Sequence, residues 1–181
     1  MNGKIILEKK QLDITIDRLC YELIEKHGDF KNTAIIGLQP RGIFLSRRIH
    51  QRIQEILKKK NILYGELDIA FYRDDFRRGS EQIIPSEMKI DFTVQDKNIV
   101  IVDDVLYTGR SIRAALDALT DFGRPLKVEL LVLVDRRYSR HLPIQPDYVG
   151  LSVDTRANDK VKVEWNENTK KDLVHIITDS K

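Results

Sequence analysis

Three short runs of consecutive apolar residues constrain the fold of this chain most. They cover residues 34–38, 99–102 and, interrupted only by Glu129, 128–134, and segments with a helical spacing of apolar side chains lie between them. Short continuous apolar runs are typical of strands that are covered on both faces. Strands of this kind that alternate with helices form an open, mostly parallel sheet with helices on both faces. We therefore expect an α/β fold.

The rest of the chain fits the same plan. The segments with helical spacing are residues 12–24, 45–57 and 112–119. The alternation of Leu67, Ile69 and Phe71 with polar residues predicts a further strand. Two more strand candidates are residues 148–153 and 161–165. Because no repeat or Gly/Ser-rich linker divides the sequence, we expect residues 1–181 to form a single domain.

Composition excludes several classes of protein. Hydrophobic residues make up 41% and charged residues 33% of the chain, which is typical of a soluble globular domain. The single cysteine, Cys20, rules out an intramolecular disulfide, and its place in a helical apolar stripe predicts burial. We find neither a signal peptide nor an apolar run long enough for a membrane span, so we expect a cytoplasmic protein without a membrane partner.

The segment after the apolar run 99–102 carries the strongest chemical signal. It reads Asp103, Asp104, Val105, Leu106, Tyr107, Thr108, Gly109, Arg110 and Ser111, and it leads into a helix. Adjacent carboxylates are costly to bury unless they meet cations or hydroxyl donors, and a ribose diol offers two hydroxyls. The amides and hydroxyls of the turn 107–111, at the positive end of a helix, suit a phosphate.

Two interpretations of this segment are open. In one, the aspartates cap a strand and the turn is ordinary, which is the usual meaning of a bare Asp-Asp pair. In the other, the segment binds a phosphorylated ribose. The Thr-Gly-Arg-Ser turn that opens a helix favours the second interpretation.

The sequence IVIVDDVLYTGRS resembles the signature with which type I phosphoribosyltransferases bind phosphoribosyl pyrophosphate (PRPP). The resemblance implies that Asp103 and Asp104 hold the ribose hydroxyls and that residues 107–111 hold the 5′-phosphate. It also implies Mg²⁺ as a cofactor that is bound with PRPP near the two aspartates, without direct protein ligands. The hypoxanthine–guanine branch of these enzymes carries an Asp at the place of Tyr107, which argues against that branch.

Further segments narrow the resemblance to one group, the bifunctional pyrimidine operon attenuation regulators and uracil phosphoribosyltransferases (PyrR-type). These segments are GLQPRG (37–42), ELDIAFYRDD (66–75), FGRP (122–125), LVLVDR (131–136) and LPIQPDYVG (142–150). The group implies an enzyme that makes uridine monophosphate (UMP) from uracil and PRPP. It also implies a regulator that binds pyrimidine-operon leader mRNA when a uridine nucleotide, UMP or UTP, is bound. The alternative is another PRPP-dependent transferase without an RNA-binding role.

The other strand ends supply the remaining candidates. By resemblance, Pro40 and Arg41 belong to the pyrophosphate loop, and Arg73 begins a long polar loop near the same group, with Arg77 and Arg78 as further cations. Arg136 and the backbone near Val161 are expected beside the base. The sequence does not show whether the peptide between Pro40 and Arg41 is cis.

Basic residues give a weaker indication of RNA binding. The candidates are Arg47, Arg48, Arg137 and Arg140, and ordinary solvated side chains explain them about equally well. Arg137 stands where a Gly is usual in the group, and one extra residue precedes Leu142. Relatives form dimers and tetramers, so we expect a homodimer or a higher homo-oligomer.

Overall fold

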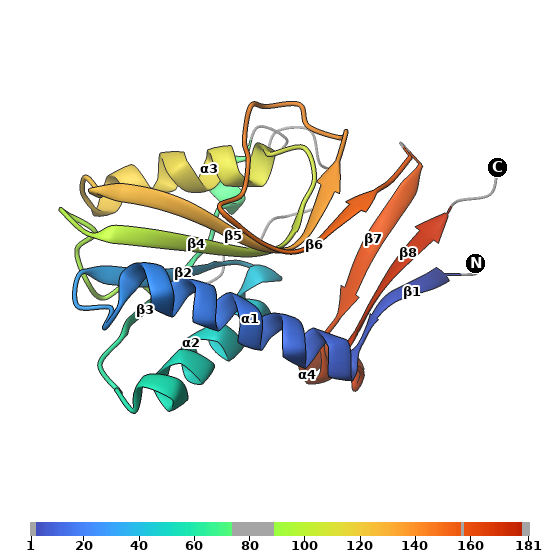
Figure 1. The fold of residues 1–181 in the computed structure, drawn as a ribbon. Coiled ribbons are helices and arrows are strands. Elements are labelled where there is room, and N and C mark those ends of the chain that lie inside the picture. The colour runs from blue at the N-terminus through green and yellow to red at the C-terminus, as the bar shows by residue number, and fades with distance from the viewer. Residues whose placement is uncertain (1–2, 74–88, 157, 179–181) are drawn as a thin grey trace.

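The computed structural model describes residues 3–73, 89–156 and 158–178 as one α/β unit with two sheets (Figure 1). The larger sheet has five parallel strands in the order β3-β2-β4-β5-β6. These strands are β3 (Leu63–Leu67), β2 (Thr33–Leu38), β4 (Asn98–Leu106), β5 (Lys127–Arg137) and β6 (Tyr148–Asp154). The predicted parallel α/β architecture is confirmed.

Helices cover both faces of this sheet. The helices α1 (Lys9–His27) and α2 (Gly42–Leu57) pack on one face, and α3 (Arg110–Leu119) packs on the other (Figure 1). In β4, Val100 and Val102 belong to the core under α1 and α2, whereas Ile99 and Ile101 belong to the core under α3. Because successive side chains of a strand point to opposite faces, a strand between two cores is apolar throughout.

A second, antiparallel sheet stands beside the first. Its order is β1-β8-β7, formed by β1 (Gly3–Glu8), β8 (Leu173–Thr178) and β7 (Asp159–Glu164), and the short helix α4 (Asn166–Thr169) follows β7. Of this sheet, only β7 was predicted from the apolar pattern, with an end at Trp165. Trp165 instead precedes α4 and is fully buried.

One predicted strand lies at a different place in the structure. The prediction of a strand at residues 67–71 is wrong, because β3 ends at Leu67 and residues Ala70–Tyr72 form a 3₁₀ turn, η1. Oδ1 of Asp68 accepts the N–H of Ala70 at 2.8 Å, and such a side-chain bond stabilises a turn in competition with a strand. Phe71 is consequently exposed. A second 3₁₀ turn, η2 (Thr120–Phe122), follows α3.

The strand β4 is longer than expected and includes the acidic pair. Its pairing with β2 ends at Val102, where β2 itself is about to end, whereas its pairing with β5 continues to Leu106. Asp103 and Asp104 therefore lie within a strand that has lost its neighbour on one side. The next segment of the chain on that side is the loop between β2 and α2.

That loop is held between two closely packed elements. A Cβ atom added to Gly37 of β2 would lie 2.0 Å from Oγ of Ser46 in α2. The strand and the helix approach this closely only because residue 37 is glycine. Residues 39–41 bridge them directly. In the described part of the chain, no helix is long and apolar enough to cross a membrane.

Candidate functional site

Two adjoining hollows lie at the carboxyl edge of the five-stranded sheet. Their volumes are about 260 Å³ and about 250 Å³. Both are lined by Arg73, Asp103, Val105, Tyr107 and Ser111. Ligands of open α/β sheets bind at this edge, so the hollows lie where the fold itself favours a site.

The first hollow contains the acidic pair. Asp104 is 5% exposed, and Oδ1 of Asp103 accepts the backbone N–H of Asp104 at 2.9 Å. Among the described residues, Oδ2 of Asp104 has no hydrogen-bond donor, and Nε of Arg41 lies 3.9 Å away from it. Burial raises the pKa of both carboxyl groups, and their mutual repulsion raises the pKa of Asp103 further. A ligand that brings hydroxyl donors or a cation would relieve this cost.

The loop after β2 forms a second wall of this hollow. Gln39, Pro40 and Arg41 line it. The peptide bond between Gln39 and Pro40 is cis, which is one peptide before the Pro40–Arg41 bond whose isomer the sequence does not show. A Cβ atom on Gly42 would lie 2.5 Å from the carbonyl oxygen of Val102. Glycine at this position lets the loop approach β4 and brings Arg41 to the carboxylates.

The second hollow lies at the start of α3. Thr108, Gly109, Arg110 and Ser111 line it. Gly109 has a φ of 90°, a left-handed conformation that favours glycine, and α3 begins at the next residue. The first amides of a helix lack acceptors within the helix, and the helix dipole adds positive charge there. This end of the site is therefore suited to an anion.

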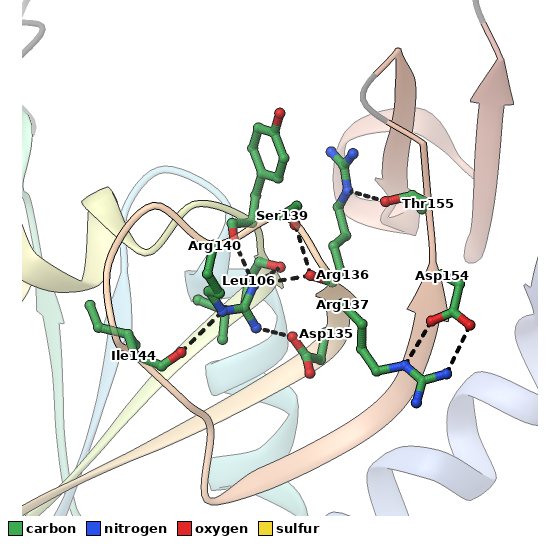
Figure 2. A network of polar contacts seen from close by, with 10 residues as sticks. Leu106, Asp135, Arg136, Arg137, Ser139, Arg140, Ile144, Asp154 and Thr155 are labelled. Atoms are coloured by element: carbon green, nitrogen blue, oxygen red, sulfur yellow. Dashed lines mark hydrogen bonds and ion pairs between the residues drawn. The ribbon is translucent and has the colours of Figure 1, made fainter.

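Arg136 and Val161 reach the first hollow from two other strands. The guanidinium of Arg136 lies 4.0 Å from the ring centroid of Tyr107, and it donates to Oγ1 of Thr155 and to the carbonyl of Asp159. Figure 2 shows its contact with Thr155. Arg136 is only 5% exposed, and burial lowers its pKa. The structure thus gathers four separate parts of the sequence around one carboxylate pair.

Arg73 lines both hollows. It follows the 3₁₀ turn η1, whose last residue, Tyr72, accepts a hydrogen bond from Nη2 of Arg113 in α3 at 3.1 Å. This contact ties the segment before Arg73 to the helix that opens the second hollow. The candidates Arg77 and Arg78 lie outside the described residues.

Comparison with known proteins identifies the family. The phosphoribosyl transferase domain model matches residues 2–168. A protein named bifunctional protein PyrR from Elusimicrobium minutum is 42% identical over 174 residues, which cover 96% of each chain. The PyrR protein of Bacillus subtilis is 39% identical over 181 residues, which cover 97% of this chain and 98% of that one. This chain belongs to the PyrR family of phosphoribosyltransferases.

Solved structures support the fold of this PyrR-family chain. A hypoxanthine phosphoribosyltransferase from Staphylococcus aureus matches with a TM-score of 0.70, covers 95% of this chain and 90% of its own, and is 17% identical. At this identity the likeness concerns the fold alone.

The four arginines predicted to bind RNA all contact carboxylates of the PyrR-family chain. Arg47 binds Glu66 through two nitrogens, and Arg137 binds Asp154 in the same way. Arg48 binds two acidic side chains, Glu167 and Asp172, and lies over the ring of Trp165. Arg140 pairs with Asp135. Of these pairs, only Arg137–Asp154 has both side chains half exposed or more, at 50% and 58%.

Three residues that line the first hollow were not among the candidates predicted from the sequence. These are Leu38, Gln39 and Ile69. Leu38 could have been identified as the last residue of an apolar run, and Gln39 as the residue before Pro40. Ile69 was assigned to a strand, and only the turn made by Asp68 shows why its side chain reaches the hollow.

Proposed function

We propose that this chain transfers ribose 5-phosphate from PRPP to uracil, forming UMP and pyrophosphate. The observation that carries the proposal is the buried pair Asp103 and Asp104, in which Oδ2 of Asp104 has no hydrogen-bond donor among the described residues, beside the start of α3 that suits an anion. A ribose that carries a 5′-phosphate satisfies both features at once. The likeness to PyrR proteins over nearly the full chain favours uracil as the acceptor.

Each residue has a proposed task in the displacement at the anomeric carbon. Asp103 and Asp104 accept hydrogen bonds from the ribose hydroxyls, and residues 107–111 hold the 5′-phosphate through backbone amides and hydroxyls. Arg41 and Arg73 bind the departing pyrophosphate and disperse its charge. The base lies beside Arg136 and Val161, which line the same hollow as Asp104.

The acidic pair also fits the Mg²⁺ that phosphoribosyltransferases generally use with PRPP. No group of three or more His, Cys, Asp or Glu side chains suited to a metal occurs among the residues described by the structure. We therefore propose that the metal is held mainly by substrate oxygens, with Asp103 and Asp104 in indirect contact. When bound, Mg²⁺ neutralises charge on the pyrophosphate.

A pyrophosphate-release assay with uracil and PRPP tests the enzyme proposal. We expect turnover with uracil and none with orotate, hypoxanthine or adenine. A preference for one of the three other bases would overturn the assignment of uracil. The absence of turnover with all four bases would overturn the enzyme proposal.

We also propose that the uridine-nucleotide complex binds pyrimidine-operon leader RNA and controls transcription attenuation. The support is the likeness to proteins named bifunctional PyrR. A gel shift on the leader RNA, with and without UMP, tests it, and equal retardation in both lanes contradicts regulation by the nucleotide. Turnover with uracil but no shift would leave the alternative, a phosphoribosyltransferase without an RNA-binding role.

Three further properties belong to the same proposal. Residues 1–181 act as one domain, the protein works in the cytoplasm, and it forms a homodimer or a higher homo-oligomer. Analytical ultracentrifugation tests the last of these, because a monomer at micromolar concentration would contradict it.

A further inference from the structure

The segment between β5 and β6 packs behind the turn 107–111. The backbone N–H groups of His141 and Leu142 both donate to the carbonyl of Thr108, at 3.0 Å and 3.2 Å. A Cβ atom on Gly109 would lie within 3.5 Å of the side chains of Ile144 and Leu142. The turn therefore lies between the second hollow and a supporting layer of chain.

Arg140 is the centre of this supporting layer (Figure 2). Its Nε donates to the carbonyl of Ile144, and its Nη2 binds the carboxylate of Asp135. Its Nη1 lies within hydrogen-bond distance of three carbonyls, those of Leu106, Tyr107 and Arg136. One guanidinium thus joins the end of β4, the end of β5 and the segment before β6.

These contacts fix the direction of two amide groups. In a trans peptide, the C=O of one residue and the N–H of the next point in opposite directions. Arg140 holds the carbonyl of Tyr107, and the supporting layer holds the carbonyl of Thr108, so the N–H groups of Thr108 and Gly109 point away from that layer. No acceptor for these two amides exists among the described residues, and both residues line the second hollow.

We propose that Arg140 is a positioning residue for phosphate binding, which holds the turn so that the amides of Thr108 and Gly109 face the hollow. The inference rests on the proposed function to the extent that the turn binds the 5′-phosphate. Arg140 supports the turn and does not itself contact the phosphate, because its donors bind groups within the chain and its side chain is only 22% exposed.

Calorimetry with UMP and uridine tests the proposal, because the two ligands differ only in the phosphate. In Arg140→Lys the ammonium keeps the charge, but it cannot reach all four carbonyls and the carboxylate that the guanidinium contacts. We expect UMP affinity to fall by about tenfold or more, the loss of at least one charge-assisted hydrogen bond, while uridine affinity stays unchanged. In turnover, KM for PRPP rises and KM for uracil is retained.

The matched control is Arg18→Lys, which changes a half-exposed arginine on α1 that pairs with Glu22. It should bind UMP like the unaltered protein. In Arg140→Ala, added guanidinium ion should restore part of the preference for UMP over uridine.

Three results would overturn the proposal. They are unchanged UMP affinity in Arg140→Lys, an equal loss of UMP and uridine affinity, and an unaltered protein that binds uridine as tightly as UMP. The comparison does not depend on turnover. A protein that fails to convert uracil but prefers UMP to uridine would contradict the proposed enzyme activity and still decide the role of Arg140.

Discussion

Nε of Arg41 lies 3.9 Å from Oδ2 of Asp104, close enough to favour the carboxylate and too far for a hydrogen bond. Arg41 comes from the loop after β2 and Asp104 from β4, about a third of the chain away, and the approach of the loop to β4 depends on Gly42. Among the described residues, this buried carboxylate oxygen of Asp104 has no hydrogen-bond donor. Burying this carboxylate costs free energy in the absence of a ligand.

Asp104→Asn should abolish PRPP-dependent turnover and raise the melting temperature at pH 7. The folded pKa of Asp104 is raised by burial, so its contribution to stability is fully present below the ordinary Asp pKa, about 4, and is lost as the pH rises through the folded value. The difference in stability between Asp104→Asn and the unaltered protein should therefore disappear at pH 4 or below. Thermal melts between pH 4 and 8, with turnover at pH 7, check both expectations.

The control for this variant is Asp13→Asn, which changes an exposed aspartate on α1. It should leave turnover and the pH profile unchanged. Full activity in Asp104→Asn would refute the assignment of this carboxylate to the ribose.

Gly42→Ala should lower turnover strongly and cost about 1–3 kcal/mol of stability, because the added methyl group overpacks against the backbone of Val102. The control is Gly28→Ala, which has a φ of 59° but no atom within 4 Å of the added Cβ. It should lose stability while keeping turnover, since it lies at the far end of α1. Equal turnover in the two variants would show that Gly42 does not shape the site.

The buried carboxylate of Glu129 lies near the start of β5, at the end of the strand away from Arg136. It should govern how the stability of the protein falls at acidic pH, without affecting turnover. Burial acts to raise its pKa, but ion pairs with Lys127 and Lys26, a hydrogen bond from Tyr148 and the neighbouring His27 hold the pKa at about 2. Its contribution, on the order of 3 kcal/mol, is present above the ordinary Glu pKa and is lost as the pH falls from about 4.5 to about 2.

Glu129→Gln should therefore flatten the acid limb of the stability curve. Urea unfolding at pH 7, 4.5 and 3 measures it, with the exposed Glu25→Gln as the control. A steep acid limb in Glu129→Gln would place the sensitive carboxylate elsewhere.

Arg137→Gln should weaken binding of leader RNA without changing the melting temperature, because its pair with Asp154 is exposed and contributes little. Arg48→Gln should show the opposite pattern. It leaves Asp172 without its guanidinium, and Asp172 has a side chain only 6% exposed, so about 1–3 kcal/mol of stability is lost. Gel shifts at matched UMP concentration and thermal melts separate the two, and a normal shift with Arg137→Gln would remove it from the RNA-binding set.

The larger sheet and the acidic pair could be predicted because their signals are local. A run such as 99–102 is typical of a strand covered on both faces, and a glycine at position 109, just before a helix, favours the left-handed turn that the structure contains. The meeting of Asp104, Arg136 and Val161 in one hollow followed from the rule that carboxyl ends of parallel strands share an edge, together with the family resemblance.

Other features depend on contacts that no local pattern records. The strands β1 and β8 are short, and each is stabilised by a partner from the opposite end of the chain. Asp68 ends β3 through one side-chain bond that the alternation of apolar residues conceals. Arg140 looks like a surface cation in the sequence, but its role is set by carbonyls that only the fold brings together.

The close approach of Gly37 to Ser46 has a consequence for ligand affinity. Because β2 and α2 are locked together, the three residues between them have little conformational freedom to lose when pyrophosphate binds. The loop of residues 39–41 is thus preorganised. The entropy that is lost when the complex forms comes mainly from ordering other parts of the site. Loosening this contact, for example by Ser46→Gly, should weaken pyrophosphate binding through entropy while leaving every contacting side chain in place.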